Sequence, residues 1–241
     1  HHQVGGGTLA LDAAVERIER TPEGVRVHAS GTTRPGAFSV DAHVALAATG
    51  FATPLRDLVD LGVETVAQGR IPALTPFWES VSAPGIFFAG NATQGAPGLR
   101  KHGVGSSSAA VHGFRYNARV LAAHLAGRLG MPVRRRRRAA SLVDELLDAA
   151  SRGPALAAQK GYLAHVVRSD GSTDLLPLAH FVDTPEAGDA AVTVEMDKGG
   201  EVFPVVYVRR RGEVEEHVLP PHPLRQYGAS EEHRRLLHEA L

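Results

Sequence analysis

The stretch from Gly85 to Gly127 places a short apolar run, a glycine-rich loop and a long helical pattern one after another. The apolar run is Ile86 to Ala89. Glycines as dense as those that follow it either make tight turns or let a ligand approach the backbone. From Ser106 onward, apolar residues recur at steps of three and four, which predicts a helix that ends near Gly127. The loop residues are Gly90, Asn91, Gly95, Gly98, Gly103 and Gly105, and the apolar helix positions are Val111, Phe114, Ala118, Leu121 and Leu125.

Two predicted strands end in a small or polar residue beside a glycine. Residues 38–48 read as a strand whose second half is buried on both faces, and it stops at Thr49 and Gly50. Ile86 to Ala89 stops in the same way at Gly90 and Asn91. In an open α/β sheet, loops at the carboxyl ends of strands line the ligand site. The small residues 103–108 would form the first turn of the next helix, where backbone N–H groups favour phosphate or an electron-rich ring edge.

The charges are unevenly distributed, although 26 basic and 26 acidic residues give a formal net charge of zero. No Asp or Glu occurs from Ser80 to Val143. The basic residues of that window are Arg100, Lys101, Arg115, Arg119, Arg128 and Arg134 to Arg138. A cationic window beside a glycine-rich loop favours an anionic ligand. The alternative is a solvated surface followed by a basic linker, and the sequence leaves both open.

The chain divides, by pattern, at the arginine run. Residues 1–130 form one predicted part, which begins with a hairpin of residues 9–20 and 25–30 around the turn sequence TPEG. Residues 131–140 form a basic linker. Residues 141–241 form a small α+β domain with an antiparallel sheet and a closing helix that Ser230 caps. The predicted elements of this part are a helix at 139–151, strands at 162–168, 190–197, 202–209 and 214–219, and a helix at 230–241.

Several classes of protein are excluded or disfavoured by what the sequence lacks. The chain has no cysteine, so any redox chemistry needs a bound cofactor. No apolar run approaches the roughly 20 residues that span a bilayer, and no signal segment is visible, so we expect a cytoplasmic protein without a membrane partner. His217 and His222 have no third ligand in sequence reach, and we expect no metal site. Gly103, Gly105 and Ser108 have the spacing G-x-G-x-x-S, which is close to the GxGxxG motif of dinucleotide-binding folds. They lie too far beyond the predicted strand that ends at Ala89 to serve as that motif.

Two segments carry a resemblance to a known family. VALAATGF (Val44 to Phe51) and APGIFFAGN (Ala83 to Asn91), followed by a helix with YNARVLAAHL, resemble the closing segments of FAD-dependent pyridine-nucleotide oxidoreductases with two dinucleotide-binding domains. That superfamily includes thioredoxin-reductase-like enzymes and flavin-containing monooxygenases. The resemblance implies a Rossmann-like α/β fold for residues 1–130, of which this chain would be the C-terminal portion. It also implies FAD and NAD(P)H as cofactors.

The resemblance carries roles over to particular residues. Thr49 and Gly50 would lie near the FAD pyrophosphate, and Gly90 and Asn91 near the ribityl chain. The residues expected near the flavin ring are Leu99, Arg100, Lys101 and His102. His102 would stabilise negative charge on reduced flavin, or would simply face solvent. Trp78 would line a ligand face or fill a core gap. No residue presents itself as a catalytic acid, base or nucleophile.

The sequence also departs from the family. Both GxGxxG motifs are absent, and Asn91 stands where Asp is commoner. The implied function is FAD-dependent oxidation of NAD(P)H, with a monooxygenase-like reaction favoured slightly by Asn91. The electron acceptor would be a small molecule, a disulfide or oxygen, and the chain could form a homodimer. The competing hypothesis is a non-enzymatic protein whose arginines 134–138 contact a polyanion, although nucleic acid is not an expected partner because no recognised module surrounds them.

Overall fold

The chain forms two compact units in the computed structural model, residues 1–52 and residues 53–241. The structure describes residues 2–4, 7–9, 12–33, 36–48, 60–133, 136–137 and 141–241. The division between the units therefore falls before residue 60, whereas we expected a boundary at residues 131–140. Among the described residues, no helix is both long and apolar enough to cross a membrane.

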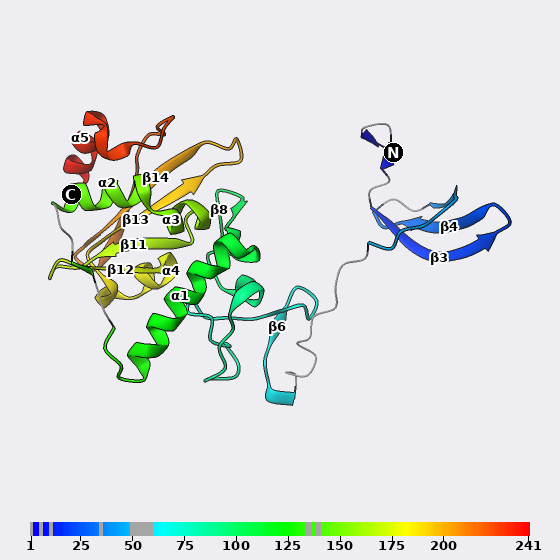
Figure 1. The fold of residues 1–241 in the computed structure, drawn as a ribbon, viewed down its shortest axis with the longest axis horizontal. Coiled ribbons are helices and arrows are strands. Elements are labelled where there is room, and N and C mark those ends of the chain that lie inside the picture. The colour runs from blue at the N-terminus through cyan, green and yellow to red at the C-terminus, as the bar shows by residue number, and fades with distance from the viewer. Residues whose placement is uncertain are drawn as a thin grey trace. The chain divides into compact units, whose positions relative to one another are not determined.

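The first unit is a small antiparallel assembly (Figure 1). Its main sheet consists of β3 (Ala13–Thr21), β4 (Gly24–Gly31) and β5 (Ala37–Ala42), and β1 (His2–Val4) pairs with β2 (Gly7–Leu9). The hairpin of β3 and β4 is confirmed. Its turn needs a glycine, because Gly24 has a φ of +150° and an added Cβ would lie 2.3 Å from the carbonyl oxygen of Ala42.

The predicted buried strand at residues 38–48 is only half formed. β5 ends at Ala42, and the following residues 43–48 adopt no strand. Val44 and Leu46 are 69% and 89% exposed, so the expectation of burial on both faces is wrong. The physical reason is that β5 pairs with β4 alone within the described part of this unit, and no second layer there covers these side chains.

The second unit begins with loops that lead into one long helix. The short strands β6 (Thr65–Val66) and β7 (Ile71–Pro72) pair, as do β8 (Arg100–Lys101) and β9 (Val104–Gly105). Two 3-10 helices, η2 (Gly90–Gly95) and η3 (Ser107–Ala109), precede α1 (Val111–Arg128). The helix is confirmed. The predicted strand Ile86 to Ala89 is reduced to one bridge between Phe87 and Glu79.

A six-stranded antiparallel sheet organises the rest of this unit (Figure 1). Its order is β10 (Arg136–Arg137), β12 (Ser172–Pro177), β11 (Leu163–Val167), β13 (Ala190–Met196), β14 (Val202–Arg210) and β15 (Glu213–Val218). Its helices are α2 (Leu142–Arg152), α3 (Pro154–Gln159), α4 (Leu178–Asp183) and α5 (Glu231–Ala240), with 3-10 turns η4 (Pro185–Ala187) and η5 (Tyr227–Ala229). The structure is thus mixed α/β. All strand pairs among the described residues are antiparallel.

Residues on both sides of the basic segment share one hydrophobic core. Trp78 is fully buried and lies 6.2 Å from the ring of Tyr162, measured between centroids. The same cluster includes Tyr116 and Leu121 of α1 and Leu163 of β11. Trp78 therefore fills a core gap, the second of the two roles considered for it. This shared core fixes the loops before α1 against the sheet.

Candidate functional site around Glu195

The hairpin of β8 and β9 carries three of the predicted cofactor-binding residues, Arg100, Lys101 and His102. Arg100 pairs with Gly105 and Lys101 with Val104, which leaves His102 and Gly103 as a two-residue turn. Both turn residues have positive φ, 49° and 78°. Positive φ at both central positions is the signature of a type I′ hairpin turn, and glycine is favoured at the second. The turn points Lys101 and His102 toward the sheet of the same unit.

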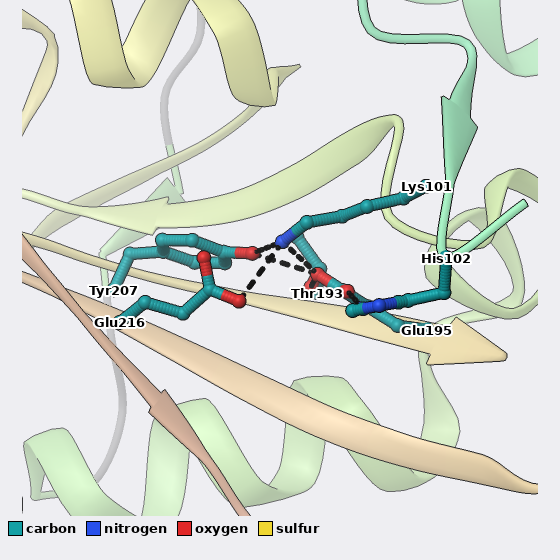
Figure 2. A network of polar contacts seen from close by, with 6 residues as sticks. All are labelled: Lys101, His102, Thr193, Glu195, Tyr207 and Glu216. Atoms are coloured by element: carbon teal, nitrogen blue, oxygen red, sulfur yellow. Dashed lines mark hydrogen bonds and ion pairs between the residues drawn. The ribbon is translucent and has the colours of Figure 1, made fainter. Parts of the chain in front are cut away.

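Lys101 is bound by three side chains of that sheet (Figure 2). Its Nζ lies 2.9 Å from Oε1 of Glu195 and 3.2 Å from Oε1 of Glu216, and it donates to the hydroxyl of Tyr207. The ammonium also lies 4.7 Å from the centroid of the Tyr207 ring, a cation–π distance. The charge of Lys101, which we expected to attract an anionic ligand, is therefore paired with carboxylates of the protein itself.

Glu195 is the centre of the arrangement. It lies inside β13 with its side chain fully buried, and its Oε1 also accepts hydrogen bonds from Thr193 Oγ1 and the Tyr207 hydroxyl, both at 2.7 Å. Its Oε2 lies 2.7 Å from Nε2 of His102. Burial alone raises the pKa of this carboxyl, but the hydrogen bonds from Lys101, Thr193 and Tyr207 outweigh it, so the pKa is lowered. Glu195 is thus a buried carboxylate that carries a charge.

The sheet register explains why these side chains meet. Thr193 and Glu195 are two positions apart in β13 and therefore lie on the same face of the strand. β14 pairs alongside, with Ala191 opposite Tyr207, and Tyr207 is in turn opposite Glu216 on β15. Burial and the negative charge of Glu195 raise the pKa of Tyr207, so the phenol stays protonated and its O–H donates a hydrogen bond to the carboxylate. The site is a charged network with one end, at His102, 36% exposed.

A second buried polar network ties the first turns of α1 to α3. Asn117 donates from Nδ2 to Thr93 and to Ser108, both at 3.1 Å. Gln159 donates from Nε2 to the carbonyl of Gly113 at 2.8 Å and to Oδ1 of Asn117 at 2.7 Å, and it accepts from Ser108. All four side chains are buried. The serine-rich segment before α1 is therefore part of the core packing.

The other predicted site residues lie in different settings. Thr49 and Gly50 fall outside the described residues. Gly90 has a φ of +68° with open space beside its Cα, and Asn91 is exposed and accepts from Gln94 Nε2 at 2.8 Å. Leu99 packs against the core cluster of Trp78, whereas Arg100 is exposed. The four predicted residues 99–102 thus lie together, Leu99 just before the hairpin and the other three within it. Lys101 and His102 also share a partner, because both contact the carboxylate of Glu195.

Sequence reasoning missed Glu195, Thr193, Tyr207 and Glu216. One signal was present: a single acidic residue interrupts the apolar strand AAVTVEM. A carboxylate is almost never fully buried unless it is paired, so its position predicts a cationic partner. Nothing in the sequence indicates that this partner comes from the loop before α1.

A hollow of about 590 Å³ lies elsewhere, between α2, α3 and the sheet. His165 and Glu145 line it, with Nε2 and Oε1 2.9 Å apart. Three arginines and three aspartates or glutamates line it, and two of the arginines form pairs, Arg234 with Asp144 at 2.5 Å and Arg152 with Asp148 at 2.9 Å. The matched charges give it no clear preference for an anion or a cation.

Comparisons of the chain with protein-family models, with curated proteins and with solved structures find no match. The functional assignment therefore depends on the residues themselves. The network around Glu195 can hold a loop in place and can orient an imidazole that is open to solvent at one side. An oriented imidazole is suited to exchanging a proton or a hydrogen bond with a ligand.

Proposed function

We propose that the chain supplies the flavin-contacting C-terminal segments of an FAD-dependent NAD(P)H oxidoreductase, with a Rossmann-like arrangement completed by sequence upstream. The observation that supports this most is the pair of motifs that end at Thr49–Gly50 and at Gly90–Asn91, the second followed by a glycine-rich loop and α1. Gly90 combines positive φ with open space, and Asn91 is exposed, which suits close approach by a polar cofactor chain.

The remaining residues define what each part would do. Flavin accepts hydride from a nicotinamide and passes electrons to an acceptor, while the protein binds, orients and tunes it. Asn91 would hydrogen-bond a ribityl hydroxyl. Arg100 and His102, the exposed members of the hairpin, would face the ring, and Lys101 would hold the hairpin from behind. The pyrophosphate would depend on Thr49, Gly50 and the upstream sequence, since this chain has no GxGxxG.

The test is the visible absorption spectrum of the chain as purified, after addition of FAD, and for the same chain extended upstream along its reading frame. We expect a flavin band near ~450 nm in the extended protein, and its loss or weakening in Asn91→Ala. Arg136→Ala with Arg137→Ala is the matched control, because both residues belong to β10, which pairs only with β12 among the described strands, and should not affect flavin. The absence of a flavin band from every form would reject the proposal. Polyanion binding that depends on the arginines and falls steeply with salt would favour the competing hypothesis.

A further inference from the structure

His102 occupies a turn position whose left-handed backbone conformation is uncommon for any residue with a side chain. A type I′ turn prefers asparagine, aspartate or glycine at its first central residue, and histidine is not among them, although it adopts positive φ more often than most residues do. His102 nevertheless has a φ of 49°. Residues held in such sparsely populated conformations cluster at functional sites. The surrounding structure must therefore hold His102 in place.

Two side chains of the C-terminal sheet hold the His102 ring. Oε2 of Glu195 lies 2.7 Å from its Nε2, and the ring of Phe203 lies 5.6 Å away between centroids. Figure 2 shows His102 and Lys101 approaching Glu195 from the same hairpin, one toward each carboxylate oxygen. Lys101 anchors the hairpin, so the backbone that carries His102 is held close to Glu195.

The contact with Glu195 determines which nitrogen of the His102 ring carries the proton. An ionised carboxylate only accepts hydrogen bonds. Glu195 receives donors on Oε1 from Lys101, Thr193 and Tyr207, which keep it ionised. Nε2 of His102 must therefore carry the proton that it donates to Oε2. In the neutral ring, Nδ1 then has the free lone pair, on a side chain that is 36% exposed.

We propose that Glu195 is a positioning residue that fixes His102 as the Nε2–H tautomer, so that Nδ1 is presented as a hydrogen-bond acceptor to the bound ligand, and that this is a task of the C-terminal sheet. The proposal deepens the proposed function and rests on it for the identity of the ligand, a flavin. The positioning itself concerns only residues of this chain. A carboxylate that orients an imidazole in this way acts through the imidazole and does not touch the ligand.

The first experiment needs no flavin. The ring nitrogens of His102 are observed by 15N NMR in the wild-type chain, with His102→Asn to assign the signals. Asparagine followed by glycine suits the same turn, so this variant keeps the hairpin. The expected result is a single Nε2–H tautomer at a pH where the ring is neutral. Fast exchange between tautomers, or the Nδ1–H form, would overturn the proposal.

Substitution of the carboxylate is the second step. Glu195→Gln removes the charge, and we expect the tautomer preference to be lost and amide exchange in residues 100–105 to accelerate at least about tenfold. Glu216→Gln is the matched control, because it also contacts Lys101 but does not touch His102. An unchanged tautomer in Glu195→Gln would contradict the proposal, as would equal effects of the two variants. If Glu195→Gln does not fold, the wild-type tautomer still decides.

The third step uses the flavin-loaded extended protein. If Glu195 acts through His102, the rates of flavin reduction in Glu195→Gln and His102→Asn fall by similar factors, and the double variant is no slower than either. Effects that multiply in the double variant would show that Glu195 acts independently, and would overturn the proposal. If no form of the protein binds flavin, the proposed function fails while the tautomer measurement still judges the positioning.

Discussion

Nζ of Lys101 and Oε1 of Glu195 lie 2.9 Å apart although 94 positions separate the two residues in the chain. The contact joins the loop before α1 to the central part of the C-terminal sheet. Glu195 is fully buried, and Lys101 is 24% exposed. A buried pair of this kind adds little to stability over an apolar alternative, but removal of one partner is expensive because the other charge is left buried.

The first prediction follows from that asymmetry. Lys101→Met should lower the free energy of unfolding by about 2–4 kcal/mol, because Glu195 loses its lysine ion pair and keeps only the hydrogen bonds from Thr193, Tyr207 and His102. Urea denaturation of the wild type and the variant measures the difference. Arg235→Met is the control, since its pair with Glu239 is about 60% exposed on both sides and should contribute little. A Lys101→Met variant as stable as the wild type would show that the buried charge is not held by this contact.

The second prediction concerns acid stability. The pKa of Glu195 is lowered from its ordinary value of 4.5 by the hydrogen bonds that outweigh its burial. The stability that ionised Glu195 gives to the folded protein is therefore fully present above about pH 4.5, and it is lost as the pH falls through the lowered pKa of the folded state. Glu195→Gln should be less stable than the wild type at neutral pH, and the gap should narrow below about pH 4.5. Denaturation midpoints from about pH 7 to 3 test this, and a constant gap would contradict it.

The third prediction concerns two histidines that enclose Phe77. His124 of α1 stacks on Phe77 at 4.0 Å between centroids, and His180 of α4 meets the same ring at 4.6 Å. Burial lowers the pKa of both histidines from the ordinary 6.5, and nearby arginines add to the effect. The unfolded chain then binds protons more readily, so stability falls as the pH drops through about 6.5.

Replacement of both histidines by phenylalanine should flatten this dependence. We expect the loss of unfolding free energy between about pH 7.5 and 5.5 to be at least halved in the double variant. It should not vanish, because burial also lowers the pKa of His165, which remains. Thermal or urea denaturation across this range is the measurement. A double variant with the wild-type slope would show that these rings are not desolvated by Phe77 and its surroundings.

The sequence predicted local structure well where periodicity or capping was decisive. The helix α1, the hairpin of β13 and β14, and the Ser230 cap, which accepts from the N–H of His233, are all found. The buried face of α1 differs from the predicted one: Val111 is 69% exposed, Tyr116 and Val120 are buried instead, and only Leu121 belongs to both faces. Strands that depend on distant partners were predicted poorly, because periodicity does not say whether a partner covers Val44 and Leu46. Only part of the site could be predicted from the sequence. Lys101 and His102 were named as site residues through the family resemblance, but their partner Glu195 is joined to them only by the tertiary fold.

The fourth prediction tests the amide network behind α1. Gln159 gives hydrogen bonds to Gly113 and Asn117 and accepts one from Ser108, all in the buried core. Gln159→Met roughly keeps the shape but removes all three hydrogen bonds, and each buried polar group left unsatisfied costs about 1–3 kcal/mol. We expect a loss of roughly 3 kcal/mol in urea denaturation. Gln94→Met, at a half-buried position with bonds only to Asn91, serves as the control with a much smaller effect.

The fifth prediction compares two glycines of the same helix. In an exposed helix interior, glycine to alanine stabilises by roughly 0.5–1 kcal/mol, because glycine loses more backbone entropy on folding. Gly127, near the end of α1, follows this rule, since an added Cβ would make only ordinary contact, 3.7 Å from Val133. Gly113 does not, because its Cβ would lie 1.9 Å from the carbonyl oxygen of Ser107.

The two alanine variants should therefore shift stability in opposite directions. Gly127→Ala should be neutral or stabilising, whereas Gly113→Ala should lose about 2 kcal/mol or more, because the clash is with backbone and pushes the Ser107 turn away from the helix. Denaturation of both variants gives the comparison. Since Ser108 and Asn117 share the network at this turn, Gly113→Ala should also accelerate amide exchange in residues 106–110. Equal stability of the two variants would contradict the close approach of Ser107 to Gly113 of α1. It would also contradict the hydrogen-bonded link from the neighbouring Ser108 to Gln159 of α3, which depends on the same approach.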